Sequence, residues 1–205
     1  MMVDWLEYEK KALEQGYHLI CGVDEAGRGP LAGPVYAAAV ILPEGCVIDG
    51  VNDSKKLTAK KRESLYDVIT ETAFSWNVAS ASVEEIDEIN ILNATYLAME
   101  RAIAGLSTPP QYILVDGNRL PPHLPAPAQA VVKGDAHSAN IAAASILAKV
   151  SRDRLLIEMD KQYPQYQFAK HKGYGTKLHR QLILEYGPSP VHRKTFLTKL
   201  LGDKK

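Results

Sequence analysis

Residues 20–34 read Ile-Cys-Gly-Val-Asp-Glu-Ala-Gly-Arg-Gly-Pro-Leu-Ala-Gly-Pro. An apolar strand ends here in two adjacent carboxylates, Asp24 and Glu25, and paired acids suit a hard divalent cation. Gly27-Arg28-Gly29 follows at once and offers uncovered backbone and a guanidinium to a phosphate or a sugar. This arrangement predicts metal-assisted chemistry on a phosphodiester.

The runs that flank these residues predict a sheet. Residues 18–23 and 35–42 are rich in Val, Ile and Ala, a Gly/Pro turn separates them, and Pro-Glu-Gly closes the second run. We expect two strands, for which a hairpin is one possible connection. The two acids are then expected at the end of the first strand.

Later segments alternate between helical and strand patterns. Thr58 is placed to cap a helix over 59–73, in which Leu65 and Ile69 recur at helical spacing. The other expected elements are strands over 74–81, 112–115 and 128–132, helices over 89–106 and 138–161, a Gly/Tyr loop around 173–175 and basic helices from 176 onward. The order predicts an α/β fold with a core over 1–162 and a helical C-terminal extension over 163–205.

Composition bounds the class of protein. The chain has 205 residues, 46% of them apolar and 23% charged, and no apolar run approaches the roughly 18 residues of a membrane span. Residues 1–15 lack the basic start and apolar centre of a signal peptide. Cys21 and Cys46 are the only cysteines, which supports neither a disulfide framework nor a thiolate zinc site. We expect one large domain in the reducing cytoplasm, with no membrane contact.

Charge is distributed unevenly along the chain, although the net charge is zero. Residues 133–205 contain 14 Lys or Arg against 6 Asp or Glu, whereas residues 1–132 contain 10 against 18. A basic C-terminal third suggests a surface that faces a polyanion, and solvated surface is an equally good explanation of the bias alone. The basic run from Lys55 to Arg62 is expected to form a solvated helix face.

Four acids stand where predicted strands end. Asp24 and Glu25 close the first strand, Asp116 closes the strand over 112–115, and Asp135 follows the next one. If these strands adjoin, the carboxylates converge and can hold two divalent ions roughly 3.5–4 Å apart, one activating a water and the other stabilising the leaving oxygen. Strand-end Asp residues also make turns, and for Asp116 alone, which begins an Asp-Gly-Asn sequence, the turn is the more common role.

The glycines suggest a competing interpretation. Gly27, Gly29 and Ala32 match the loose dinucleotide-binding fingerprint, which requires a helix to begin there and present its amides to a pyrophosphate. Pro30 and Pro34 lead instead into another strand pattern. Because two carboxylates before the loop would also repel the pyrophosphate, we disfavour a dinucleotide-dependent oxidoreductase.

Six motifs, spread over residues 24–176, together resemble ribonuclease HII and follow that family's order. They are the opening Asp-Glu-Ala-Gly-Arg-Gly-Pro-Leu-Ala-Gly-Pro-Val, then Asn52-Asp-Ser-Lys-Lys-Leu, Val115-Asp-Gly, Lys133-Gly-Asp, Ala143-Ala-Ser-Ile-Leu-Ala-Lys-Val-x-Arg-Asp and His171-Lys-Gly-Tyr-Gly-Thr. The resemblance implies a ribonuclease H fold with a mixed central sheet and an endonuclease that depends on Mg²⁺ or Mn²⁺. It also implies a substrate of RNA paired to DNA, or of single ribonucleotides embedded in duplex DNA.

The resemblance assigns roles to individual residues as well. The family's catalytic, metal-binding acids fall on Asp24, Glu25, Asp116 and Asp135. The implied substrate contacts are a sensor of the 2′-hydroxyl, a tyrosine that stacks on the sugar after the ribonucleotide, and a phosphate contact; they fall respectively on Gly27-Arg28-Gly29, Tyr174 and Lys55.

The long helix expected over 138–161 adds further candidates. Ser145, Lys149 and Arg152 fall on one helix face, where a hydroxyl and two cations can grip a phosphate backbone. Asp153 is flanked by arginines and is expected to form an ion pair or to lie on the helix surface rather than to bind metal. His171 is a candidate for phosphate binding or proton transfer, with an ordinary surface role as the alternative.

Together these features predict a monomeric member of the ribonuclease HII family. We expect it to use water to cut on the 5′ side of a ribonucleotide, leaving a 3′-hydroxyl and a 5′-phosphate. Residues 1–17 are too short for the extra N-terminal domain of ribonuclease HIII, which favours type II. A silent hybrid-binding module would lack an acid, and a resolvase or transposase core would lack the two glycine loops. Residues 200–205 carry no family motif, so the sequence gives a sliding-clamp contact no support.

Overall fold

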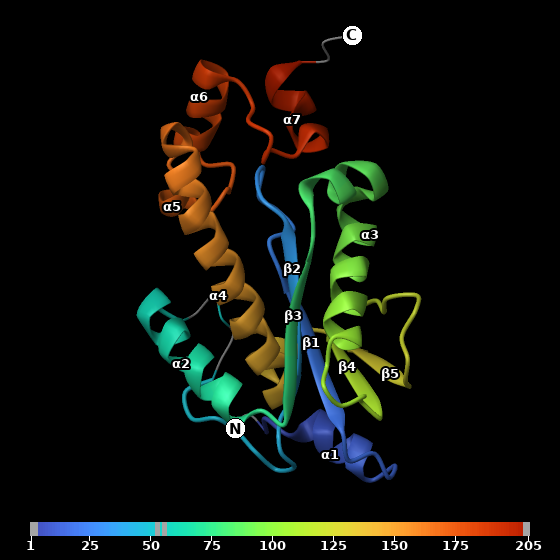
Figure 1. Ribbon diagram of the computed structural model, residues 1–205. Coiled ribbons are helices and arrows are strands. Elements are labelled where there is room, and N and C mark those ends of the chain that lie inside the picture. The colour runs from blue at the N-terminus through green and yellow to red at the C-terminus, as the bar shows by residue number, and fades with distance from the viewer. Residues whose placement is uncertain (1–3, 52–53, 55–56, 203–205) are drawn as a thin grey trace.

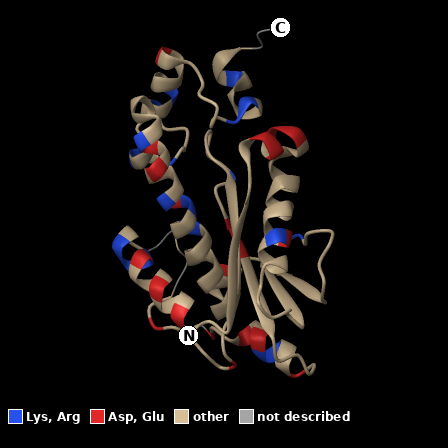
Figure 2. Cartoon of the chain, viewed as in Figure 1, with Lys and Arg blue, Asp and Glu red and all other residues tan. Residues whose placement is uncertain are grey.

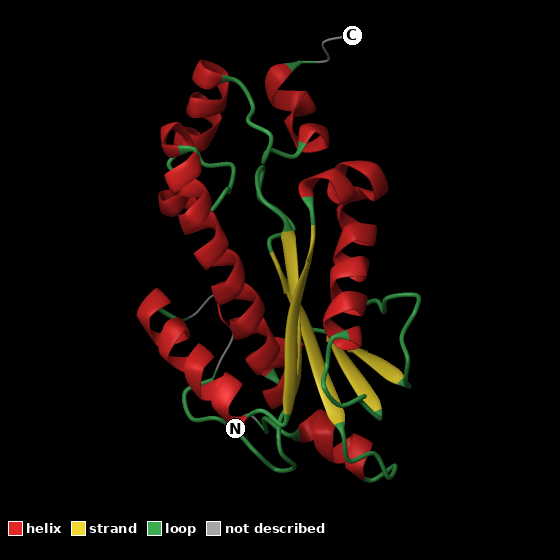
Figure 3. Cartoon of the chain, in the orientation of Figure 1, coloured by secondary structure: helices red, strands yellow, loops and turns green. Residues whose placement is uncertain are grey.

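The computed structural model describes residues 4–51, 54 and 57–202. Its centre is a five-stranded sheet in the order β3-β2-β1-β4-β5, yellow in Figure 3. β2 is antiparallel to β1 and β3, whereas β4 is parallel to β1 and β5, so the sheet is mixed as predicted. The strands are β1 (Ile20–Ala26), β2 (Val35–Ile41), β3 (Ser75–Ala81), β4 (Tyr112–Asp116) and β5 (Ala128–Val131).

Helices account for most of the remaining chain. They are α1 (Glu7–Leu13), α2 (Ala59–Thr72), α3 (Val83–Ala104), α4 (Ala139–Gln162), α5 (Phe168–His171), α6 (Lys177–Tyr186) and α7 (Lys194–Leu201), with 3₁₀ turns η2 (Gly134–Ala136) and η3 (Pro164–Tyr166). Thr58 caps α2 as predicted, because its hydroxyl accepts the Lys61 N–H at 3.2 Å. Throughout residues 4–51, 54 and 57–202, no helix combines the length and apolarity that a bilayer crossing needs.

Two of the predicted elements differ from their expected bounds by more than one residue at an end. β1 continues through Asp24 and Glu25 to Ala26, because β2 supplies pairing partners for all three residues, so the two acids lie within the strand rather than at its end. α3 begins at Val83 instead of residue 89, since Ser82 opens a capping box. Asn90 then interrupts this helix with a left-handed φ of 67°.

The sheet is covered on both faces, by α3 on one and by α4 with α2 on the other (Figure 1). Ala37 and Ala39 of β2 pack in the cluster with α3, and Ala38 and Val40 pack in the cluster with α4. Burial on both sides explains why β2 is a continuous apolar run rather than an alternating one. α4 crosses β1 so closely that a Cβ on Gly22 would lie 2.2 Å from the carbonyl carbon of Asn140.

The C-terminal helices lie beyond one end of the sheet and build a separate small core (Figure 1). Phe168 and Leu182 pack there against Leu156, near the end of α4, and against Ala32, in the loop between β1 and β2. An isolated backbone bridge joins Ala32 to His192. The last part of the described chain thus packs directly on the loop that carries the Gly-Arg-Gly sequence.

Candidate active site

The sheet topology brings the predicted acids together. β1 and β4 are parallel neighbours with Val23 opposite Val115, so Asp24 and Asp116 follow at adjacent positions of the same edge. The N–H of Gly134 donates to Asp116 Oδ1 at 2.7 Å, and this contact fixes the turn that carries Asp135. Asp24 and Asp135 are both buried.

The four carboxylates influence one another electrostatically. Burial holds the pKa of Asp24 well above its usual range, and the charges of Glu25, Asp116 and Asp135 raise it further. The N–H of Glu25 donates to Asp24 Oδ1 at 2.7 Å, and Arg28 Nη1 lies 3.6 Å from Glu25 Oε1. Such crowding of like charges is unfavourable unless a proton or a cation offsets it.

The donor set suits a cation that is only partly coordinated by protein. Within the described residues, no group of three or more His, Cys, Asp or Glu side chains is arranged to hold a metal ion by itself. Mg²⁺ usually takes one or two carboxylates and completes its octahedron with water and substrate phosphate. A cluster of buried and partly buried acids at an accessible sheet edge fits that requirement.

The two glycines of the Gly-Arg-Gly turn differ in their surroundings. Gly27 has a φ of 98°, and a Cβ there would lie 2.0 Å from Arg152 Nε, so the fold itself requires glycine. Gly29 has no left-handed φ, and a Cβ there would meet nothing within 4 Å. Arg28 and Gly29 are exposed. Gly29 therefore borders open space beside the acids.

Two buried arginines hold the loop between β1 and β2 that carries this turn. Arg152 donates to the carbonyls of Ala32, Pro34 and Lys172 at 3.0–3.1 Å. Arg193 donates to the carbonyls of Gly27, Arg28 and Gly33 at 2.6–2.9 Å. Burial lowers the pKa of both guanidinium groups. The expected phosphate contact through Arg152 is wrong, because its side chain is fully buried and occupied with backbone carbonyls.

The loop of Tyr174 lies against the same turn. The N–H of Leu31 donates to the carbonyl of Gly173 at 2.8 Å, and a Cβ on Gly173 would lie 2.6 Å from the Ala32 oxygen. The Tyr174 ring is 43% exposed, with Lys149 Nζ 5.8 Å from its centroid. An aromatic face and a cation are thus available together beside the Gly-Arg-Gly turn.

The other residues predicted on α4 have local partners. Ser145 is buried, and its hydroxyl donates to Ser54 Oγ at 2.8 Å, which ties α4 to the segment that carries Lys55. Lys55 itself lies outside the described residues. Lys149 Nζ pairs with Asp153 Oδ1 at 2.7 Å, so the ion pair expected of Asp153 is confirmed.

Arg62 and His171 were misplaced by the sequence prediction. Arg62 is not on a solvated face, since its guanidinium donates to the carbonyls of Ser54 and Leu57 and braces this segment. His171 is buried rather than on the surface: its Nδ1 accepts the Gly173 N–H at 3.2 Å, and its Nε2 lies 2.8 Å from the Tyr166 oxygen. Both side chains support loops through these contacts.

A cavity of about 300 Å³ opens beside the acids, and the sequence prediction missed part of its lining. Glu25, Arg28 and Asp116 line one side, and Tyr96 of α3 and Arg119 line another. Arg119 follows Asp116 by three positions, and this short separation from a candidate acid could have indicated that Arg119 lies at the same site. Tyr96 lies in an ordinary helical pattern and carries none.

Comparisons with known proteins agree with this geometry. The family model "Ribonuclease HII" matches residues 21–199. A ribonuclease HII from Caldicellulosiruptor saccharolyticus is 56% identical over 198 residues, which cover 97% of this chain and 96% of the relative. The match includes the acids, the Gly-Arg-Gly turn and the C-terminal helices within one continuous range.

Solved structures show the same architecture. The ribonuclease H2 of Pyrococcus horikoshii OT3 superimposes with a TM-score of 0.73 at 30% identity, covering 88% of this chain and 96% of that one. RNase HII from Archaeoglobus fulgidus, solved in complex with PCNA, has a TM-score of 0.67 at 25% identity, covering 86% of this chain and 94% of that one. With the family match and 56% identity over nearly the whole length, this chain belongs to the ribonuclease HII family of metal-dependent nucleases.

Proposed function

We propose that this protein hydrolyses RNA in RNA–DNA hybrids and incises on the 5′ side of single ribonucleotides embedded in duplex DNA, leaving a 3′-hydroxyl and a 5′-phosphate. The observation that carries the proposal is the meeting of four carboxylates beside an exposed Gly-Arg-Gly turn and a half-exposed tyrosine. The acids suit phosphodiester hydrolysis, and the turn and the tyrosine suit recognition of a sugar.

The proposed catalytic residues are the four acids. Asp24, Glu25, Asp116 and Asp135 would hold two Mg²⁺ or Mn²⁺ ions in the substrate complex. When bound, such ions lower the pKa of the attacking water and neutralise charge on the leaving oxygen. The chain contributes fixed carboxylate positions, because β1 and β4 are rigid neighbours and the Gly134 N–H holds Asp116 in place.

The proposed substrate contacts surround the acids. The backbone of Gly27 to Gly29 would test for the 2′-hydroxyl, with Arg28 reaching a phosphate, and Tyr174 would stack on the next sugar. Lys149 and Lys55 are proposed as phosphate contacts. Ser145 is proposed to act at the substrate site as well; its hydroxyl donates to Ser54, next to Lys55 in the chain.

We further propose that the protein acts as a monomer in the cytoplasm, with residues 163–205 completing the substrate surface of a core formed by 1–162. The described part of the extension supports this, since it packs on the Gly-Arg-Gly loop. PCNA is the partner of the Archaeoglobus relative. Residues 203–205 lie outside the described residues, and we propose no clamp contact for this chain.

One assay tests the proposed activity. The protein is incubated with Mg²⁺ or Mn²⁺ and one of three labelled duplexes: an RNA–DNA hybrid, a DNA duplex with one ribonucleotide, and an all-DNA duplex. We expect cuts in the first two only, at the 5′ side of the ribonucleotide. If the ribonucleotide duplex stays intact while the hybrid is cut, embedded ribonucleotides are not substrates; if neither is cut, the proposed function is wrong.

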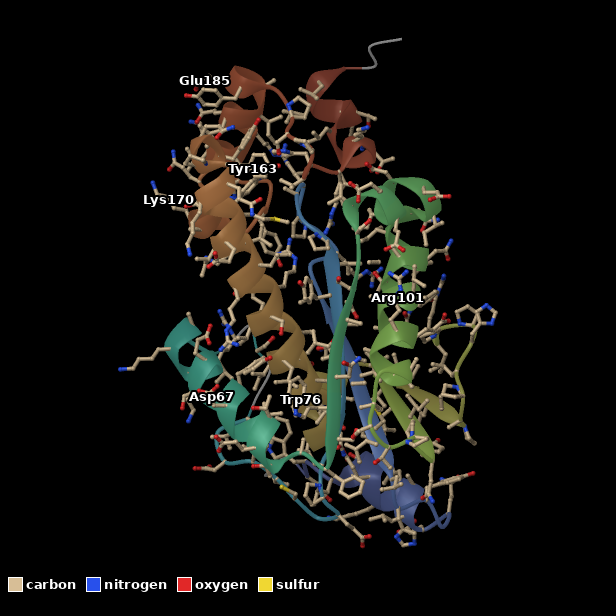
Figure 4. All side chains as sticks on the ribbon, in the orientation of Figure 1. Asp67, Trp76, Arg101, Tyr163, Lys170 and Glu185 are labelled. Atoms are coloured by element: carbon tan, nitrogen blue, oxygen red, sulfur yellow. The ribbon has the colours of Figure 1, made fainter. Side chains whose placement is uncertain are left out.

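Matched variants test the proposed metal ligands. We expect Asp24→Asn and Asp116→Asn to lose cleavage by a factor of at least about 10³ while duplex binding is largely retained, because each removes a charge that the reaction needs. Asp67→Asn is the control, since Asp67 is an exposed acid on α2, labelled at the edge of the molecule in Figure 4. Full activity of Asp116→Asn would show that the metal assignment is wrong.

A further inference from the structure

The Gly-Arg-Gly turn presents two backbone N–H groups that have no acceptor. Neither the N–H of Arg28 nor that of Gly29 donates to any atom of the residues that the structure describes. Both residues are exposed, and open space adjoins Gly29. Two adjacent donors beside a carboxylate cluster are suited to the oxygen of a sugar or a phosphate.

Arg193 fixes the direction of these two donors. Its Nη2 binds the Gly27 oxygen at 2.6 Å and its Nη1 binds the Arg28 oxygen at 2.9 Å. These oxygens belong to the same two peptide units as the N–H groups of Arg28 and Gly29. In a trans peptide the C=O and N–H point in opposite directions, and no cis peptide occurs in the described chain. Because Arg193 draws both carbonyls inward, both N–H groups are turned outward.

Arg193 is itself held rigidly. Its own N–H donates to the Leu31 oxygen at 2.9 Å, and its guanidinium lies 5.1 Å from the centre of the Phe196 ring. The following helix, α7, is fixed by Asp87 of α3, whose carboxylate accepts the N–H groups of Lys194 and Thr195 at 2.9 and 3.0 Å. Arg193 is thus held by the β1–β2 loop through Leu31, and the residues that follow it are held by α3 through Asp87.

From these contacts we infer that Arg193 is a positioning residue for recognition of the ribonucleotide, which rests on the proposed function. It touches no reacting atom. It aligns the N–H groups of Arg28 and Gly29 as a preformed pair of donors for the 2′-hydroxyl and for the adjacent phosphate of the ribonucleotide. The C-terminal segment therefore sets the discrimination between RNA and DNA at a turn more than 160 residues earlier.

A merely structural role predicts a different outcome from a positioning role. Loss of a structural brace lowers the fraction of folded protein and weakens binding of every duplex equally. Loss of the donor alignment weakens binding of the ribonucleotide duplex and leaves binding of the all-DNA duplex, which relies on phosphate contacts, nearly unchanged. The ratio of the two affinities separates the two roles.

The experiment compares Arg193→Lys with Arg101→Lys. A lysine lacks the planar guanidinium of Arg193 and can replace only some of its three hydrogen bonds to backbone carbonyls. Arg101, labelled on α3 in Figure 4, also donates to a backbone carbonyl, that of Ser80 at 3.0 Å, and serves as the control. Anisotropy with Ca²⁺ in place of Mg²⁺ measures the affinity of each folded variant for a duplex with one ribonucleotide and for its all-DNA counterpart.

We expect the ratio of the affinity for the ribonucleotide duplex to the affinity for the all-DNA duplex to be about tenfold lower in Arg193→Lys, as for the loss of one or two hydrogen bonds to the substrate. Arg101→Lys should keep the ratio of the unaltered protein. A ratio in Arg193→Lys equal to that of the unaltered protein would overturn the inference. If the unaltered protein shows no preference and no incision, the proposed function fails instead.

A second measurement does not depend on the variant folding. In ¹H–¹⁵N spectra of the unaltered protein, the amide signals of Arg28 and Gly29 are expected to shift on addition of the ribonucleotide duplex and to shift much less with the all-DNA duplex. Equal shifts with both duplexes, or none, would contradict the assignment of these N–H groups as the donors that Arg193 aligns.

Discussion

At the scale of single residues, the two glycines of the turn have different reasons to be glycine. Gly27 satisfies a demand of the fold, because its φ is left-handed and Arg152 fills the space beside it. Gly29 satisfies no demand of the fold, since its backbone is unstrained and its surroundings are empty. The simplest physical reason for the absence of a side chain at Gly29 is the close approach of a ligand.

Alanine substitutions separate these two reasons. Gly27→Ala is expected to lower the free energy of unfolding by about 1–3 kcal/mol, because its Cβ would overlap the Arg152 side chain. Gly29→Ala is expected to change stability by less than about 0.5 kcal/mol and to reduce ribonucleotide incision at least about tenfold. Urea denaturation and the cleavage assay measure the two effects. An active, stable Gly29→Ala protein would refute the proposed ligand contact.

Tyr174 tests the aromatic contact at the same scale. Tyr174→Ala is expected to weaken binding of the ribonucleotide duplex by at most about 1–3 kcal/mol, which is the contribution of an aromatic ring stacked on a base, whereas Tyr174→Phe should retain most of the affinity. Tyr186 is also exposed and provides the control Tyr186→Ala. If both alanine variants bind equally well, the ring of Tyr174 makes no contact with the substrate.

At the scale of elements, two buried histidines connect the C-terminal helices to the Tyr174 loop. The Ser189 N–H donates to His192 Nδ1 at 3.0 Å, so the His192 proton sits on Nε2 and is donated to His179 Nε2 at 3.0 Å. His179 then donates from Nδ1 to the Tyr174 oxygen at 3.0 Å. This direction of hydrogen bonds holds only while both rings are neutral.

The pH dependence of stability follows from this network. Burial lowers the pKa of His179 and of His192 from 6.5 to about 4. In the unfolded chain these histidines take up protons below about pH 6.5, but in the folded protein they do so only near pH 4, so their contribution to stability is complete above pH 6.5 and is lost as the pH falls toward 4.

Urea midpoints between pH 7 and pH 4.5 measure this loss. His192→Gln is expected to flatten the decrease, because one of the coupled histidines is gone. His18→Gln changes an exposed ring and is expected to leave the decrease unaltered. Identical pH profiles for the unaltered protein and His192→Gln would show that the buried network does not control acid stability.

At the scale of the whole molecule, the charge distribution agrees with a nucleic-acid substrate. Figure 2 shows Lys and Arg intermixed with Asp and Glu along α4 and α2, Lys and Arg on the C-terminal helices, and acidic residues at the start of α3. The basic elements include the helix that carries Lys149, beside the Tyr174 ring. A cationic surface next to the acids would offset the repulsion between those acids and phosphate.

Salt dependence of binding tests this arrangement. We expect the affinity for the ribonucleotide duplex to fall as salt rises, with a slope of about −0.9 on a double logarithmic plot for each phosphate contacted. Lys149→Gln should reduce the slope by about one, whereas Lys10→Gln, in an exposed ion pair on α1, should not. Equal slopes for all three proteins would remove Lys149 from the proposed interface.

The sequence alone carried much of the fold and the core of the site. Apolar runs bounded by Gly/Pro turns predicted the strands, because strands buried on both faces are apolar at nearly every position, and helical spacing of apolar residues predicted the long helices. The four acids are predicted as the candidate site from local features, the acids beside apolar runs and the glycine turns, although β1 continues past Asp24 and Glu25. The sequence does not reveal roles that depend on distant backbone. Arg152 is predicted as a phosphate contact, His171 as a phosphate-binding, proton-transferring or surface residue, and no pattern singles out Arg193.

What the sequence by itself determined is the chemistry: a pair of acids before a Gly-Arg-Gly turn, two further acids after later strands, and family motifs in order. What only the tertiary structure decided is how that turn is held. Arg193 and the Gly27 oxygen are separated by 166 positions, and hydrogen bonds between side chains and backbone carbonyls leave no periodic trace in sequence. Strand pairing placed the acids, Arg193 holds the turn beside them, and Arg152 holds the rest of the loop that carries the turn.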